Sequence, residues 1–206
     1  MSAATLEFWF EFASTYSYPA AMRVARRASE REVTVVWRPF LLGPIFGAQG
    51  WRDSPFNIYP AKGQYMWRDL ERICAREELP LRRPSRFPRN GLVAARVATA
   101  AEAEAWLPDF VRGMYRANFA EDREISEPAV VGDVLRAVGA DPSIWLERAQ
   151  APAVKDRLRA ATESAQARGI FGAPSFVVDG ELFWGNDRLD DALEWACARA
   201  AEARDQ

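Results

Sequence analysis

The sequence predicts an α/β fold in which both ends of the chain build one sheet and a large all-helical insertion separates them. Residues 6–40 give a strand, a helix and a second strand in succession. Residues 173–203 give two strands joined by Asp179-Gly180, a hairpin signal, and then a helix. Residues 65–168 show only helical periodicity. Because neither terminal unit is stable alone, we expect their strands to pair in one sheet.

The first strand and the turn after it organise the chain. In Leu6–Phe12 every second residue is apolar, which is the period of a strand. A hydroxyl-rich turn, Ala13–Ser17, then leads into helical periodicity over Tyr18–Ser29. This arrangement directs the first amides of a helix, and the positive end of its dipole, at a group placed over Ser14. A simpler interpretation, which the turn alone leaves open, is that Ser14 or Ser17 only caps the helix.

The second strand is expected from Val33 to about Phe40, and its connection to the first implies parallel pairing with a right-handed crossover. The segment Gly43–Gly63 follows, in which glycines and prolines are spread among apolar and aromatic residues. This composition predicts an irregular, lid-like segment. Three tryptophans, Trp9, Trp37 and Trp145, are expected in the core, because large aromatic side chains are usually buried.

The central part of the chain is expected to hold six helices, at residues 65–78, 91–104, 106–119, 127–138, 141–150 and 152–168. Pro128 and Pro142 suit the first turn of a helix, and Ser126 is a plausible cap. The basic, proline-rich run Leu81–Asn90 is interpreted as a solvated loop rather than a phosphate site. We therefore expect a sheet domain of residues 1–63 and 169–206 and a helical insertion domain of residues 64–168.

Composition excludes several kinds of chemistry. The chain has 206 residues, a formal net charge of -2 and no histidine. A Ser-His-Asp triad, a Cys-His pair and a His-ligated metal are therefore impossible, and we expect no metal site. Cys74 and Cys197 have no metal or redox spacing and are expected to be buried free thiols, which suits a cytoplasmic protein. We expect no nucleic-acid partner, no membrane span and no signal peptide.

Four segments carry a resemblance to a known family. The turn FEFASTYSYPA resembles the strand-to-helix active-site turn of 2-hydroxychromene-2-carboxylate isomerases and kappa-class glutathione transferases, in which a Ser-x-x-Ser-like turn replaces a redox Cys-x-x-Cys. The segment GIFGAPSFVVDGELFWGNDRLD resembles the cis-proline strand and the Gly-Asn-Asp-Arg motif of the same family. PFNIYPAKGQYMWRDLER and RFPRNGLVAARVA resemble the isomerases as well. The resemblance implies a thioredoxin-like (DsbA-like) fold for the sheet domain.

The resemblance also implies a glutathione site. Ser14 would contact the sulfur of glutathione, and the backbone of Ala173 would pair with its cysteinyl unit beside a cis-Pro174. The γ-glutamyl end would be held by Trp184, Gly185, Asn186 and Asp187, and Lys62 is expected to face glutathione as well. Asp187 has a simpler interpretation, as the cap of the last helix, Leu189–Ala203.

The organic substrate of these isomerases is an aromatic 2-hydroxychromene-2-carboxylate, so the resemblance implies an apolar cleft with a cation. Asn57, Arg89 and Asn90 are expected to face this substrate. The walls are expected from Phe46, Trp51, Phe56, Tyr59 and Trp67, and the cation from Lys62, Arg68 or Arg89. The sequence departs from the family at Gly47, where many relatives have a lysine, and at Thr15, where a proline is common. It also departs at Pro19, where leucine is commoner.

The function implied by the resemblance is a glutathione-dependent isomerisation. A glutathione thiolate, stabilised by a hydroxyl and a helix N-terminus, would add to a conjugated double bond and leave again after rotation. Two alternatives stay open: a kappa-like transferase that conjugates electrophiles, and a non-catalytic binding module. A dithiol oxidoreductase is disfavoured, because serines stand where its thiols would be. By resemblance, the chain is expected to form a homodimer.

Overall fold

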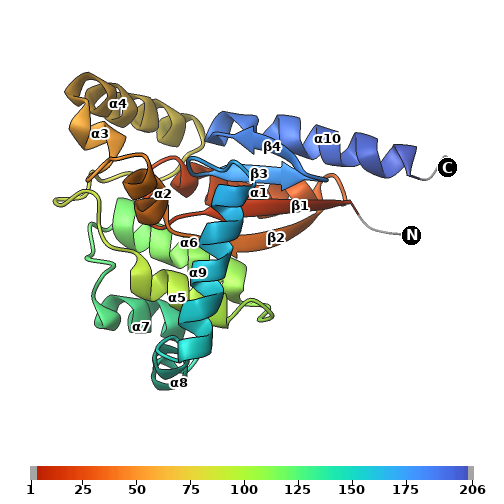
Figure 1. Ribbon diagram of the computed structural model, residues 1–206. Helices are drawn as coiled ribbons and strands as arrows, with labels where there is room; N and C mark the ends of the chain where they lie inside the picture. The colour runs from red at the N-terminus through yellow and green to blue at the C-terminus, as the bar shows by residue number, and fades with distance from the viewer. Residues whose placement is uncertain (1–3, 204–206) are drawn as a thin grey trace.

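One four-stranded sheet joins the two ends of the chain, as expected (Figure 1). The computed structural model describes residues 4–203. The strands are β1 (Thr5–Phe10), β2 (Thr34–Pro39), β3 (Ser175–Val178) and β4 (Glu181–Trp184), in the order β2-β1-β3-β4. β1 pairs with β2 in parallel and with β3 antiparallel, and β3 pairs with β4 antiparallel. The strand–helix–strand and strand–strand–helix units thus share the sheet that neither could form alone.

Alternate residues of β1 point to opposite faces of the sheet, and different helices cover these two faces. Phe8 belongs to the main core cluster, together with residues of α1 (Ser17–Ser29) and α10 (Leu189–Glu202). Trp9 belongs to a second cluster on the other face, together with residues of α2 (Leu42–Ala48) and α9 (Pro152–Ala167). The predicted burial of the three tryptophans is confirmed, with 3% to 7% of each residue exposed.

The expected helical part of the chain is present. The helices between α2 and α9 are α3 (Pro55–Ile58), α4 (Pro60–Arg76), α5 (Leu92–Ala100), α6 (Leu107–Phe119), α7 (Pro128–Ala137) and α8 (Pro142–Arg148). In Figure 1, α5 to α8 lie on one side of the sheet and α4 lies on the other. Prolines at the first turn set several of these boundaries, since proline there loses no hydrogen bond. The main core cluster takes in residues of the sheet and of this helical part, so the two are packed together.

The prediction of an irregular segment over residues 43–63 was wrong. Helices α2 and α3 and the start of α4 occupy it, so the expected domain boundary at residue 63 lies inside α4. Its glycines serve purposes other than flexibility. A Cβ at Gly63 would lie 2.2 Å from the carbonyl oxygen of Phe56, so glycine allows α3 and α4 to touch. Gly50, with φ of 80°, follows the end of α2 in the left-handed conformation that commonly stops a helix.

Two smaller expectations also changed. Cys74 is a buried free thiol as predicted, but Cys197 is only half-buried, at the margin of the main core cluster. Burial raises the pKa of the Cys74 thiol to about 11, so it stays protonated at neutral pH. The predicted cap at Ser126 is absent, because Glu127 holds the cap position of α7 without a side-chain hydrogen bond.

Candidate active site

Ser14 lies in the turn between β1 and α1 and connects two distant parts of the chain. Its hydroxyl donates to the carbonyl oxygen of Ala173, at 2.8 Å, across 159 residues of sequence. The same oxygen accepts the backbone N–H of Ser17, the first residue of α1, at 3.3 Å. The capping interpretation is therefore met in part, since Ser14 satisfies one free amide of the helix. The bond to Ala173 goes beyond a cap and fixes the start of α1 against the segment before β3.

The predicted cis bond between Ala173 and Pro174 is present, and Phe87-Pro88 is cis as well. The carbonyl oxygen of Pro174 accepts the backbone N–H of Gly185, at 3.0 Å. The segment before β3 is thus held on one side by the end of β4 and on the other by Ser14.

A cavity of about 890 Å³ opens beside Ser14 and Ala173. Its wall is mainly apolar and includes the aromatic side chains of Phe46, Trp51, Phe56, Phe87, Phe171 and Trp184. The rings of Phe46 and Trp51 lie 5.5 Å apart, and those of Phe171 and Trp184 lie 4.8 Å apart. Apolar walls around a few polar groups are typical of small-molecule sites.

Two predicted wall residues lie elsewhere. Tyr59 is exposed, and its ring lies under the ammonium of Lys62, with 4.9 Å between Nζ and the ring centre. Trp67 is buried in the core, where its ring packs on Phe87 at 5.1 Å. Helix periodicity explains the second error, since Trp67 shares the buried face of α4 with Leu70.

Glu11 is a cavity residue that the sequence analysis did not propose. Its residue is 8% exposed, and one carboxylate oxygen accepts the backbone N–H of Ala13, at 2.9 Å. Burial raises the pKa of the Glu11 carboxyl to about 7, although hydrogen bonds from the backbone of Ala13 and Ser14 oppose the shift. A carboxyl that titrates near neutral pH therefore lies in the wall of the same cavity as the Ser14 hydroxyl.

Three cationic residues line the cavity: Arg52, Lys62 and Arg89. The side chain of Arg89 is 2% exposed and donates to the carboxylate of Asp122 and to the side chain of Asn118. Its guanidinium therefore holds the preceding loop against the end of α6 and is not directed at a ligand. Arg68, another candidate cation, pairs with Glu71 at 2.7 Å and is absent from the cavity wall.

The other predicted substrate residues support the wall rather than form its centre. Asn57 donates to the carboxylate of Asp53 and to the carbonyl oxygen of Phe87 and does not line the cavity. Asn90 does line the cavity, but its side-chain oxygen accepts the backbone N–H of Leu92, at 2.9 Å, at the start of α5.

The residues predicted for the γ-glutamyl end divide into two groups. Trp184 lines the cavity, whereas Gly185, Asn186 and Asp187 lie beyond its wall. Asn186 is buried, and its side-chain oxygen accepts from the guanidinium of Arg23 at 2.8 Å. The Asp187 side chain is 72% exposed. It makes no cap of α10, whose cap position holds Arg188, so the capping interpretation of Asp187 was wrong.

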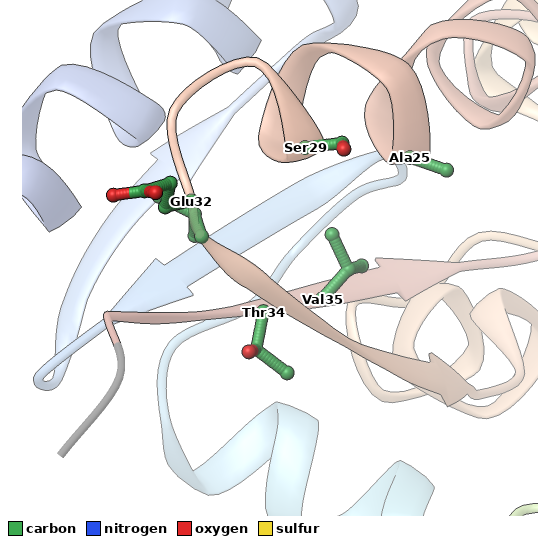
Figure 2. A pocket seen from close by; sticks show the side chains of 6 residues that line it. Ala25, Ser29, Glu32, Thr34 and Val35 are labelled. Atoms are coloured by element: carbon green, nitrogen blue, oxygen red, sulfur yellow. The ribbon is translucent and has the colours of Figure 1, made fainter.

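A second hollow, of about 500 Å³, lies between the end of α1 and the start of β2 (Figure 2). Ala25, Ser29, Glu32, Thr34 and Val35 surround it, with Val33. It brings together no pair of groups suited to catalysis. Within residues 4–203 no cluster of Asp, Glu or Cys could hold a metal ion, and no helix is long and apolar enough to cross a membrane.

Comparisons with known proteins agree with this geometry. A family model described as a DSBA-like thioredoxin domain matches residues 5–194. A 2-hydroxychromene-2-carboxylate isomerase of Sphingobium xenophagum is 30% identical over 187 residues, which are 90% of this chain and 94% of that protein. Glutathione S-transferase kappa 1 of Homo sapiens is 27% identical over 200 residues, which are 90% of this chain and 88% of that protein.

A solved structure of a 2-hydroxychromene-2-carboxylate isomerase superposes with a TM-score of 0.83 at 25% identity, and covers 97% of this chain and 98% of that one. A cytosolic disulfide reductase of Pseudomonas aeruginosa, solved with glutathione, shares the fold with a TM-score of 0.67 at 14% identity, over 97% of this chain and 99% of that one. The chain therefore belongs to the DSBA-like thioredoxin family, among relatives that include the 2-hydroxychromene-2-carboxylate isomerases and kappa-class glutathione transferases.

Proposed function

We propose that this protein is a glutathione-dependent cis-trans isomerase of aromatic compounds of the 2-hydroxychromene-2-carboxylate type. One observation carries the proposal: the Ser14 hydroxyl lies at the start of a helix, bound to the carbonyl before cis-Pro174, and faces an aromatic-walled cavity. The names of the isomerase relatives support the reaction. We propose in addition that the enzyme is cytoplasmic and forms a homodimer.

Glutathione binding would change the hydrogen bond of Ser14. The carbonyl oxygen of Ala173 now accepts the Ser14 hydroxyl, at 2.8 Å. If the cysteinyl N–H of glutathione pairs with this carbonyl in the manner of a strand, it competes with Ser14 for the acceptor. The hydroxyl can then turn its proton toward the sulfur. Ser14 would in this way be held ready by the same carbonyl that receives the tripeptide.

The chemistry needs the thiolate of glutathione. An ordinary thiol titrates at about pH 8.5, so most of it is protonated at neutral pH. The N-terminus of α1 and a hydroxyl bond to sulfur would both favour the thiolate. Held beside Ser14 and Ala173, the thiol would supply a nucleophile that adds reversibly to a conjugated C=C bond, so that this bond could rotate with no net oxidation or reduction.

The γ-glutamyl end of glutathione would lie toward Gly185–Asp187, beside the start of α10. We expect Asp187→Ala to weaken glutathione binding and to leave the fold intact. The reason is that the Asp187 carboxylate is exposed and its only ion pair is with its neighbour Arg188 among residues 4–203. Calorimetric titration and thermal unfolding of the variant test both parts. Equal affinity in the variant and the wild type would remove Asp187 from the site.

A kappa-like transferase is the second candidate, and the relationship to human glutathione S-transferase kappa 1 favours it. It would share the Ser14 site and differ in the fate of the adduct. The isomerase regenerates glutathione, whereas the transferase consumes one glutathione for each product formed. A non-catalytic binding module would do neither.

The decisive experiment is a calorimetric titration with glutathione, followed by addition of 2-hydroxychromene-2-carboxylate while free thiol is measured over time. Binding and isomerisation at constant thiol would support the isomerase. Binding and loss of thiol would support the transferase. Binding without either reaction would leave a glutathione-binding module, and absence of binding would refute the glutathione site.

A further inference from the structure

Arg52 is a cation in the cavity wall that neither the sequence analysis nor the family motifs identified. It follows Trp51 in the connection between α2 and α3. Backbone hydrogen bonds shape this connection: Trp51 donates to the carbonyl oxygen of Phe46, at 2.9 Å, and Gly50 donates to that of Gly47, at 3.0 Å. Arg52 therefore extends from a defined turn at an aromatic part of the wall.

The charge of Arg52 is unmatched in the structure. Within residues 4–203 it takes part in no ion pair. Its neighbour Asp53 lies in the same wall but forms no ion pair with it, and the Asp53 carboxylate accepts the backbone N–H of Ser54 and the side-chain amide of Asn57. An arginine with free donors beside apolar surface can bind a planar oxyanion through two parallel hydrogen bonds.

The other two cations of the cavity differ from Arg52 in their surroundings. Arg89 is held by Asp122 and Asn118, and the Lys62 ammonium lies over the ring of Tyr59, which is outside the cavity wall. Gly47, where many relatives have a lysine, contributes no side chain. Of the two arginines in this wall, Arg52 is thus the one whose planar set of hydrogen-bond donors has no ion-pair partner among residues 4–203. Lys62 also forms no ion pair within this range, but its ammonium is a point charge and does not match a carboxylate through two parallel hydrogen bonds.

We propose that Arg52 binds the carboxylate of the organic substrate and so selects aromatic carboxylates over neutral aromatic compounds of the same shape. This proposal rests on the proposed function, since it concerns the second substrate of the same cavity. The carboxyl of Glu11 lies in the wall near Ser14, so an anionic substrate would be repelled there when Glu11 is ionised. The aromatic part would lie among the rings of Phe46 and Trp51, next to the guanidinium.

Binding of unreactive analogues tests the assignment independently of catalysis. The probes are trans-cinnamate and trans-cinnamamide, which have the same shape and differ in charge, titrated calorimetrically into the protein with saturating glutathione. We expect Arg52→Gln to weaken cinnamate roughly tenfold, the factor that corresponds to about 1.4 kcal/mol. Cinnamamide should change by less than about twofold, because it has no charge to lose. The conservative variant Arg52→Lys should recover part of the preference.

Arg68→Gln is the matched control, because Arg68 is exposed, pairs with Glu71 and lies outside the cavity wall. It should leave both affinities unchanged. The proposal is overturned if Arg52→Gln keeps the wild-type preference for cinnamate, if it weakens both probes equally, or if the wild type binds neither probe. A preference that depends on Arg52 in a protein without isomerase turnover would refute the proposed function and leave the role of Arg52 standing.

Discussion

Replacing Glu11 by glutamine should remove most of the pH dependence of stability that this buried carboxyl causes. The glutamine is nearly the same size, and its oxygen can still accept the backbone N–H of Ala13. What the variant loses is the ability to ionise. In the folded chain burial raises the pKa of Glu11 from its ordinary value of 4.5 to about 7.

The size of the effect follows from these two values. Between pH 4.5 and pH 7 the unfolded chain releases the Glu11 proton while the folded chain keeps it, so the folded state becomes less stable as the pH rises. The full interval corresponds to about 3 kcal/mol, at about 1.36 kcal/mol for each pH unit. The stabilising contribution is complete below pH 4.5 and lost above pH 7. In the range from pH 5 to pH 8, the wild type should lose about 2 to 3 kcal/mol through Glu11.

Urea unfolding at several pH values measures this loss directly. The wild type and Glu11→Gln should differ in the slope of unfolding free energy against pH, with the smaller decrease in the variant. Glu181→Gln is the control, because Glu181 is exposed at the start of β4 and should not change the slope. Equal slopes in Glu11→Gln and the wild type would refute the argument that Glu11 is buried and titrates near pH 7.

Three further substitutions test other parts of the site. Ser14→Ala should lower the unfolding free energy by about 1 to 2 kcal/mol in urea, because two hydrogen bonds are lost, and should leave calorimetric glutathione affinity within a few-fold. A loss of more than a few-fold in glutathione affinity would contradict this expectation for Ser14. Gly172→Ala should weaken binding of aromatic probes, because the new Cβ would lie 2.4 Å from the ring nitrogen of Trp184 in the cavity wall. Gly47→Ala should not weaken this binding, because its added Cβ would meet no atom within 4 Å. Equal effects of the two substitutions would contradict the packing argument. Arg89→Gln breaks the buried pair with Asp122, so it should lower the unfolding free energy by roughly 3 kcal/mol and leave the KM for the organic substrate unchanged. A large rise in KM without destabilisation would instead support a role of Arg89 in substrate binding.

Several helices and strands were predicted correctly from short sequence patterns. The alternation in β1, the hairpin at Asp179-Gly180 and the prolines at helix starts are each visible within a few residues. The resemblance also assigned Ser14 and Ala173 to one glutathione site, although the two residues lie 159 positions apart in the sequence. These features were predictable because each rests on a short pattern or on one long-range match of motifs.

The errors concern side chains whose surroundings come from distant parts of the chain. Arg89 belongs to a basic run that is typical of a solvated loop, and only the fold supplies Asp122 and Asn118 around it. Glu11 was expected within the first strand, where a polar side chain is often exposed, but it lies just after the end of β1. Gly91, which is distant in the sequence, lies beside it: an added Cβ there would lie 3.5 Å from a Glu11 carboxylate oxygen.

The prediction of an irregular segment at residues 43–63 failed for a related reason. Glycine and proline were interpreted as loop residues, but here they start and stop short helices and allow close helix packing. The residue Arg52 was overlooked inside this segment, because no pattern marks an arginine whose charge the fold leaves without a partner.

The state of the glutathione thiol in the complex tests the central claim most directly. Ultraviolet absorbance of the thiolate, followed against pH with the protein in excess over glutathione, gives the pKa of the bound thiol. Free thiols titrate at about pH 8.5, and we expect the bound thiol to titrate at about pH 7.5 or below, since the helix N-terminus and the Ser14 hydroxyl favour the anion. In Ser14→Ala the value should move back toward that of free glutathione. A bound thiol that titrates like free glutathione in the wild type would contradict the claim that this turn activates the thiol.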